Sequence, residues 1–200
     1  MDFRQTYCFD DLLLVPKYSD IKSRSEVDLS SNLSTDIGLN LPVISSPMDT
    51  VTESSMAIAM QAFGGLGIIH RYNTIDEQVA LVRDARMKGE NHVGAAIGVT
   101  GDYEERSCML YDAGARIICL DIAHGHHAMM KSAIKNLKKV FGDDVHIMAG
   151  NVASLEAFDD LSKWGADSIR VGIGGGSICS TRIVTGHGVP TLQSVLDCSR

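Results

Sequence analysis

The chain has 200 residues, of which 44% are hydrophobic and 22% are charged, and it carries a formal net charge of −7 with a pI near 5.4. This composition supplies enough apolar side chains for a packed core and excludes an intrinsically disordered chain. The acidic balance gives no general attraction to nucleic acid or to an anionic membrane, so any phosphate ligand must be held locally. The length suits one domain or part of a larger one.

The cysteines and the N-terminus indicate the compartment. Five cysteines are widely spaced with no Cys-x-x-Cys pair, which argues against a disulfide framework and against a structural metal. Reduced thiols suit a cytosolic protein. No apolar run reaches membrane-spanning length, and residues 1–5 lack the apolar core of a signal peptide. We therefore expect a cytoplasmic protein that binds neither a membrane nor nucleic acid.

The elements follow a regular order after an irregular start. Residues 1–40 are expected to form an extended arm, because proline and serine interrupt their short apolar runs. From residue 41 onward, short apolar runs alternate with amphipathic segments. The predicted strands are residues 42–47, 66–70, 93–98, 117–121, 145–149 and 168–173. The predicted helices are residues 52–63, 75–88, 103–113, 127–141, 155–164 and 190–197.

This alternation determines the expected fold class. Six nearly all-apolar strands that alternate with helices predict a parallel sheet covered by helices. Polar residues follow every strand but the third, which is typical of a (β/α)8 TIM barrel. An open doubly wound sheet would instead concentrate them at one crevice. We expect about six of the eight barrel units within residues 41–200, with the first and sixth strands as open edges.

The strongest candidate for an active site is the stretch from Gly172 to Pro190. Its glycines allow the backbone to approach a bound group, and its N–H groups can cradle a phosphate. Cys179 stands among hydroxyl groups and near Arg182, an environment that can stabilise a thiolate. Glycines and a cysteine alone would suit a flexible loop with a buried thiol. The polar residues after Cys179 favour a nucleophile, and the other four cysteines are expected to fill space.

Polar candidates also follow three other predicted strands. Asp121 opens the run DIAHGHH, whose histidines suggest a metal site, but their turn-like spacing favours Asp121 as an acceptor for a ligand amide or hydroxyl. Asn151 can donate and accept at a polar ligand edge, or simply form a turn. Ser46 and Met48 lie in the run SSPMDTVTE, where the methionine can pack on a planar base or in an ordinary core.

Four motifs in this chain resemble those of the IMP dehydrogenase/GMP reductase family. In the family's order they are FDDLLLVP (9–16), SPMDTVTE (46–53), GNV (150–152) and GIGGGSICSTRIVTGHGVP (172–190). The last motif alone is specific enough to indicate the family, and the resemblance covers essentially all 200 residues.

The resemblance implies a TIM barrel that binds a purine nucleotide, with Cys179 attacking C2 of the base. In the dehydrogenase, a hydride passes from C2 of IMP to NAD⁺, and water hydrolyses the resulting thioimidate to XMP. In the reductase, attack on GMP expels ammonia and NADPH returns a hydride to give IMP. The motifs favour the dehydrogenase, because reductases tend to have Asn before Met48 and Lys after Arg182. A non-catalytic nucleotide-binding remnant is the third alternative.

The resemblance also implies roles for individual residues. Thr181 would lie beside the thiolate, and Asp121 would lie near the nicotinamide together with Asn151. The carbonyl groups expected to bind a potassium ion are those of Gly174, Gly176 and Cys179. The residues expected to contact the nucleotide are Ser46, Met48, Asn151, Arg170 and Ser177, the last of them at its phosphate.

Several features depart from the family pattern. Gly175, Ser180 and His187 are unusual in the loop, and the position of His187 is commonly apolar. Few residues separate the second helix from the third strand, where most dehydrogenases insert paired CBS modules, so none is expected here. The family's ribose-binding acidic residue, second phosphate loop and flap with a water-activating Arg-Tyr pair would lie beyond residue 200. We expect weak or no turnover from the chain alone, and a homotetramer where the barrel is complete.

Overall fold

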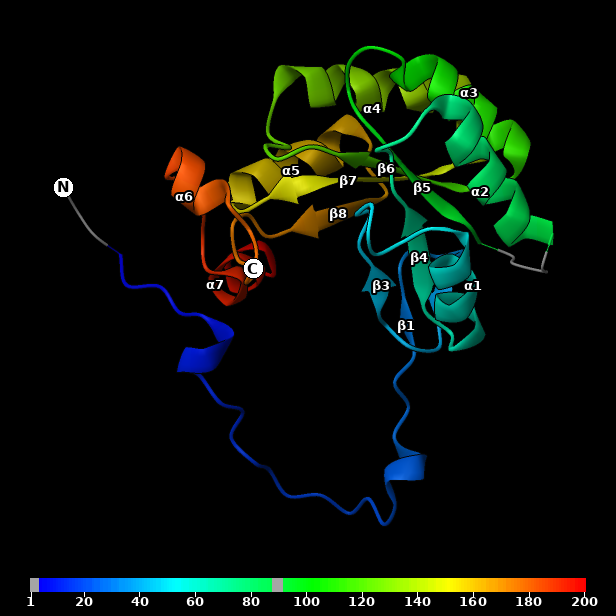
Figure 1. Ribbon diagram of the computed structural model, residues 1–200. Coiled ribbons are helices and arrows are strands. Elements are labelled where there is room, and N and C mark those ends of the chain that lie inside the picture. The colour runs from blue at the N-terminus through cyan, green and yellow to red at the C-terminus, as the bar shows by residue number, and fades with distance from the viewer. Residues whose placement is uncertain (1–3, 88–91) are drawn as a thin grey trace.

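The computed structural model describes residues 4–87 and 92–200. Its central sheet contains six strands in chain order: β3 (Ile44–Ser45), β4 (Leu66–Ile69), β5 (Gly94–Ile97), β6 (Ile117–Asp121), β7 (His146–Val152) and β8 (Ser168–Val171). The helices that connect these strands are α1 (Ser54–Ala62), α2 (Ile75–Met87), α3 (Tyr103–Ala113), α4 (Ala128–Phe141) and α5 (Leu155–Trp164). Two further helices, α6 (Thr181–Thr185) and α7 (Thr191–Cys198), follow β8 (Figure 1).

The sheet curls into a half-barrel, with helices on its outer side (Figure 1). Each neighbouring pair of strands, from β3–β4 to β7–β8, is parallel. Strands β3 and β8 are the two edges of this sheet among the described residues. The predicted fold class, a TIM barrel represented by about six of its eight strand–helix units, is therefore confirmed.

Alternate side chains of each strand point to opposite faces of the curled sheet, as strand geometry requires. The outward-facing side chains pack beneath the helices and include Ile69, Ile97, Leu120 and Ala149. The inward-facing side chains form a second buried cluster that includes Ile68, Ala96, Cys119 and Met148. This inner cluster also contains Ile37 and Leu39 of a small antiparallel hairpin, β1 (Ser31–Asn32) and β2 (Gly38–Leu39). The hairpin therefore closes one end of the half-barrel.

The N-terminal arm contacts the body at its beginning and at its end. Near its beginning, the guanidinium of Arg4 bonds both carboxylate oxygens of Asp197 on α7, at 3.0 and 2.8 Å. A short turn, η1 (Phe9–Asp11), comes first. Every residue from 12 to 30 is exposed, and within this segment only η2 (Arg24–Glu26) is assigned secondary structure. Figure 1 shows this segment leaving the side of α7 and returning to β1 through open space. The extended arm predicted for residues 1–40 thus includes the β1–β2 hairpin.

Most predicted element boundaries agree with the structure within two residues, and β6, α3 and α5 agree at both ends. The predicted end of α2 at residue 88 lies outside the described residues. Strand β7 continues three residues beyond its predicted end, because Gly150 still pairs with Asp121 and Arg170. The expectation that four cysteines fill space is wrong for Cys8 and Cys108, which are exposed.

A buried polar network joins α2 and α3 beneath the carboxyl ends of β4 and β5. The guanidinium of Arg106 donates to Gln78 Oε1 at 2.9 Å, to the Asn73 carbonyl at 3.1 Å and to Asp102 Oδ2 at 2.8 Å. Gln78 is fully buried and donates in turn to the Ala96 carbonyl of β5 at 2.8 Å. The network therefore satisfies polar groups that would otherwise be buried without partners.

Replacing Arg106 by methionine is expected to lower the free energy of unfolding by about 2–3 kcal/mol, because the Gln78 and Asn73 oxygens lose their donor inside the protein. Urea unfolding followed by circular dichroism measures the loss. Arg83→Met, at an exposed position of α2, is the matched control and should change stability by less than about 0.5 kcal/mol. Equal effects of the two substitutions would contradict a stabilising network.

Candidate active site

Two backbone hydrogen bonds hold the ends of the loop that follows β8. The Gly172 N–H donates to the Val152 carbonyl at 2.7 Å, and the Val189 N–H donates to the Ile173 carbonyl at 3.1 Å. Gly174 has φ +77°, and a Cβ at this position would lie 2.7 Å from Arg182 Cγ. Glycine is therefore required here both for the left-handed backbone and for the arginine stem that packs on it. The loop projects from the carboxyl end of the sheet, where barrel enzymes place their sites.

Cys179 lies half-buried within this loop, two residues before Thr181. Its Sγ is 3.4 Å from Thr181 Oγ1, and its N–H donates to the Gly176 carbonyl at 3.1 Å. Hydrogen bonds from the Thr181 hydroxyl and backbone lower the pKa of the Cys179 thiol, and the charge of Arg182 acts in the same direction. The structure thus brings together the predicted nucleophile and the residue predicted to lie beside it.

Cys119 presents the opposite environment. It is fully buried inside β6, and burial raises the pKa of its thiol to about 11. A buried neutral thiol is a small apolar core residue rather than a nucleophile. The contrast between Cys119 and Cys179 follows from their surroundings, since both are ordinary cysteines in the sequence.

Asp121 and Arg170 form an ion pair on the inner face of the half-barrel. Both residues are in register with Gly150, which lies on the strand between theirs. A Cβ at Gly150 would lie 2.6 Å from the Cβ of Arg170, so the glycine leaves room for the arginine side chain to cross β7. Arg170 therefore occupies one carboxylate oxygen of Asp121, and contact between Asp121 and a ligand remains a prediction.

Arg170 and Ser46 line one small cavity of about 160 Å³ between the two edge strands, β3 and β8. Ser46 is held in a turn whose centre is the fully buried Thr52, which donates to the Ser46 carbonyl at 2.6 Å. The Met48 N–H donates to the same carbonyl at 2.8 Å, while the Met48 side chain is 38% exposed. The two predicted nucleotide contacts of the 46–53 motif thus lie on one turn at the mouth of the half-barrel.

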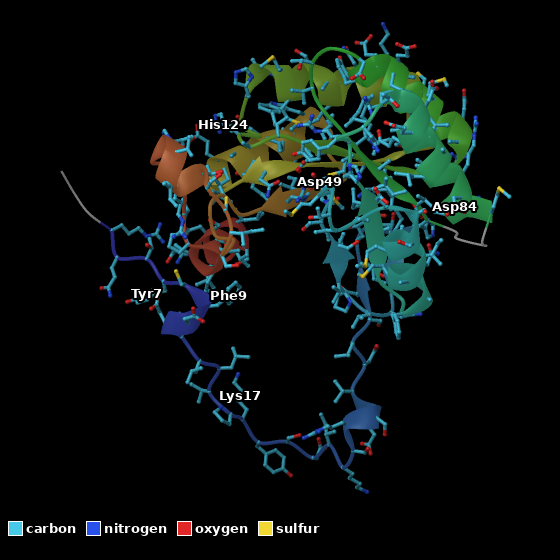
Figure 2. All side chains as sticks on the ribbon, in the orientation of Figure 1. Tyr7, Phe9, Lys17, Asp49, Asp84 and His124 are labelled. Atoms are coloured by element: carbon cyan, nitrogen blue, oxygen red, sulfur yellow. The ribbon has the colours of Figure 1, made fainter. Side chains whose placement is uncertain are left out.

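Ser177 faces a second cavity of about 340 Å³. Arg182, Gly174 and Gly175 line the same cavity from the loop, and residues 8–10 line it from the N-terminal segment. Figure 2 shows Phe9 on this segment where it approaches α7. Sequence reasoning missed the contribution of the N-terminal segment, although the motif FDDLLLVP marked the segment as distinctive.

A third cavity, of about 610 Å³, is mainly apolar and lies beside α6. It is lined by Thr181, Thr185 and His187 from the loop, and by His124 from the segment after β6. Figure 2 shows His124 on the side of the molecule near α6. Sequence reasoning noted His187 as unusual but did not place it with His124 or with Thr181.

Asn151 has a structural role in this arrangement. Its side-chain Nδ2 donates to the Gly172 carbonyl at 2.9 Å, and its backbone N–H and carbonyl bond Ile122 and Gly125. Asn151 therefore ties the beginning of the active-site loop to the ends of β6 and β7. Contact between Asn151 and a nucleotide or nicotinamide remains a prediction.

Two of the histidines after Asp121 make local hydrogen bonds. His126 Nε2 lies 2.9 Å from Asp160 Oδ2, and His127 Nδ1 accepts from the Met129 N–H at the start of α4. Within residues 4–87 and 92–200, no group of three or more His, Cys, Asp or Glu side chains is placed to hold a metal ion. The same residues contain no helix that is both long and apolar enough to cross a membrane.

Residues 6–200 match the family model of the IMP dehydrogenase / GMP reductase domain. The inosine-5'-monophosphate dehydrogenase of Nitrosopumilus maritimus is 33% identical over 323 residues, covering 100% of this chain and 68% of the relative. The inosine-5'-monophosphate dehydrogenase of Cryptosporidium parvum is 39% identical over 233 residues, covering 96% and 57%. The GMP reductase of Leishmania major is 29% identical over 325 residues, covering 96% and 66%.

The N. maritimus relative is longer than this chain within the aligned region. The alignment with the N. maritimus enzyme extends over 323 positions although this chain contributes 200, so the relative carries residues with no counterpart here. The chain spans between 57% and 68% of the length of these three relatives.

Proposed function

This chain belongs to the IMP dehydrogenase/GMP reductase family, and from that premise we propose that it carries out the NAD-dependent oxidation of IMP to XMP through a covalent bond to Cys179. The observation that supports the proposal most directly is the environment of Cys179. Its thiol stands on a glycine-rich loop at the carboxyl end of β8, with Thr181 Oγ1 3.4 Å from the sulfur and its pKa lowered.

Cys179 performs the covalent step in this mechanism. The thiolate attacks C2 of the hypoxanthine ring, and the Thr181 hydroxyl donates a hydrogen bond that stabilises the thiolate before attack and when it is released. When bound, NAD⁺ supplies the acceptor for the hydride that leaves C2. Asp121 would face the nicotinamide with the carboxylate oxygen that does not bond Arg170. Asn151 would hold the loop in place beside the nucleotide and the nicotinamide, through its hydrogen bond to the Gly172 carbonyl.

The remaining contacts orient the nucleotide. Ser177 and Arg182 line one cavity, and a hydroxyl and a guanidinium together suit a phosphate. Ser46 and Arg170 line another, where they would contact the ribose and the base, with Met48 packing at its rim. The nucleotide would therefore lie along the loop, with its phosphate on the Ser177 side and its C2 atom at Cys179.

A potassium ion fits the donor type of the loop. The candidate ligands are the carbonyl oxygens of Gly174, Gly176 and Cys179, and hard monovalent cations prefer such oxygens. The Gly176 carbonyl accepts the Cys179 N–H and retains its second lone pair for a cation. A bound ion would hold the loop closed around the nucleophile.

A GMP reductase is the second candidate, because one relative with that name covers 96% of this chain. The same attack by Cys179 on C2 would then expel ammonia from GMP, and NADPH would supply the hydride.

The test is to incubate the chain with IMP plus NAD⁺ and, separately, with GMP plus NADPH. Absorbance of the reduced nicotinamide reports hydride transfer, and intact mass spectrometry reports a nucleotide adduct on Cys179. We expect an adduct and reduced cofactor with IMP plus NAD⁺. Oxidation of NADPH in the reaction with GMP, without reduction of NAD⁺ in the reaction with IMP, would favour the reductase. Nucleotide binding without any adduct would support the third alternative, a non-catalytic nucleotide-binding remnant.

A further inference from the structure

Thr52 belongs to the turn that carries Ser46 and Met48, and it is fully buried. Its N–H donates to the Met48 carbonyl at 3.0 Å, and its own carbonyl accepts the His70 N–H at 3.2 Å. Its hydroxyl oxygen lies 2.6 Å from the Ser46 carbonyl oxygen and 2.9 Å from Ser45 Oγ. Each polar group of Thr52 is therefore hydrogen-bonded within the protein, as burial requires.

The directions of the two hydroxyl contacts follow from their chemistry. The Thr52 hydroxyl has a single hydrogen, and the Ser46 carbonyl oxygen can only accept one. That hydrogen is therefore directed to Ser46. The contact at 2.9 Å then requires the Ser45 hydroxyl to donate to Thr52 Oγ1. A chain of two hydrogen bonds thus runs from the side chain of Ser45 through Thr52 to the backbone of Ser46.

His70 attaches the end of this turn to the segment that follows β4. The ring of His70 is almost fully buried, and its Nδ1 accepts the Tyr72 N–H at 3.1 Å. In the neutral ring the hydrogen is then on Nε2, which lies 3.5 Å from Glu53 Oε1. Glu53 directly follows Thr52, whose carbonyl accepts the His70 N–H. Backbone and side chain of His70 therefore hold two consecutive residues of the turn.

The turn leads from Thr52 to the cavity of about 160 Å³ between β3 and β8. Ser46 lines this cavity with Arg170, and its carbonyl accepts both the Thr52 hydroxyl and the Met48 N–H. The orientation of the Ser46 backbone thus depends on Thr52. Because Thr52 is fully buried, an effect of this residue on a bound nucleotide must pass through the residues of the turn.

We propose that Thr52 is a positioning residue for the nucleotide. Its hydroxyl holds the turn in the conformation that presents Ser46 and Met48 to the ribose and the base. The inference rests on the proposed function, which puts these parts of the nucleotide in the cavity of Ser46 and Arg170. Loss of the hydroxyl leaves the Ser46 carbonyl without its side-chain donor, so the turn relaxes and nucleotide affinity falls. The covalent step at Cys179, which stands on a different loop, is retained.

The test measures affinity for IMP separately from adduct formation in the 200-residue chain. Thr52→Val keeps nearly the same shape and removes the hydroxyl. It is expected to raise the Kd for IMP, measured by calorimetric titration without NAD⁺, by about 10-fold, the effect of one lost hydrogen bond in a buried setting. With saturating IMP plus NAD⁺, adduct formation on Cys179 should stay within a few-fold of the unaltered rate. Thr52→Ser, which keeps the hydroxyl, should restore the Kd to within a few-fold.

A double-mutant cycle tests whether Thr52 acts through Ser46. Ser46→Ala should itself weaken IMP binding, and Thr52→Val should weaken it less in that background than in the unaltered chain. Ser45→Ala removes only the donor to Thr52 Oγ1 and should raise the Kd by a smaller factor than Thr52→Val. It supplies the measurement if circular dichroism shows that Thr52→Val does not fold.

The matched control is Thr50→Val, at an exposed position of the same turn, which should leave the Kd for IMP unchanged. A purely structural role for Thr52 would lower the free energy of unfolding and leave the Kd of the folded chain unaltered. That result, additive effects in the cycle, or an unchanged Kd in Ser45→Ala would overturn the role of Thr52 alone. Failure of the unaltered chain to bind IMP would overturn the proposed function and this inference together.

Discussion

Replacing Cys179 by serine is expected to abolish the nucleotide adduct and to reduce hydride transfer from IMP to background. In the proposed mechanism the sulfur is the atom that bonds C2, and removal of a covalent nucleophile leaves only the catalysis that binding provides. Intact mass spectrometry after incubation with IMP and NAD⁺ measures the adduct, and nicotinamide absorbance measures the transfer.

The matched control is Cys108→Ser, which changes an exposed thiol on α3 outside the loop and should leave the adduct intact. Alkylation offers an independent measurement. Because the pKa of Cys179 is lowered, its thiolate forms at a lower pH than that of an ordinary cysteine, and its alkylation rate should reach its plateau correspondingly earlier as pH rises. Cys119 should resist alkylation until the chain unfolds or the pH nears 11. An adduct that persists in the serine variant would refute the assignment.

Replacing Arg170 by methionine is expected to lower the free energy of unfolding by about 2–3 kcal/mol, because Asp121 is left as an unpaired carboxylate on the inner face of the half-barrel. The side chains are 26% and 19% exposed, so the loss should fall below that of a completely buried pair. The same change should weaken nucleotide binding, since Arg170 lines the cavity between the edge strands. Urea unfolding and calorimetric titration with IMP measure the two effects.

A double-mutant cycle with Asp121→Asn tests whether the pair itself is responsible. The effects of Arg170→Met and Asp121→Asn should be strongly non-additive, because each single change removes the same interaction. Arg4→Ala, which breaks an exposed pair with Asp197, is the control and should cost no more than about 1 kcal/mol. Additive effects of the two inner substitutions would show that the ion pair has no net stabilising role.

The strand and helix order was predictable because its signals are local. Helices α3 and α5 end at Gly114 and Gly165, and both glycines adopt the left-handed conformation that terminates a helix. Helix α6 was missed, because Thr181–Thr185 is barely more than one turn and contains β-branched residues. The end of β7 was missed because a glycine and an asparagine there suggested a turn, whereas Gly150 continues the ladder between β6 and β8.

The site was predictable only where its parts are neighbours in sequence. Cys179 and Thr181 are two residues apart, so their contact could be expected from the motif. The Asp121–Arg170 pair joins residues 49 positions apart and depends on the register of three strands and on the missing side chain of Gly150. The distribution of the candidate residues over three cavities depends on the path of the loop and of the N-terminal segment, which no local pattern determines.

The closed base of the active-site loop has a consequence for engineering. Residues 174–188 leave and re-enter the scaffold between Ile173 and Val189, which are bridged to each other, and the Gly172 N–H is anchored on Val152. A segment with such closely spaced attachment points behaves as an exchangeable cassette. The corresponding segment of a dehydrogenase or a reductase could be transplanted between these anchors without altering a strand, which would allow reaction preference to be compared on one constant framework.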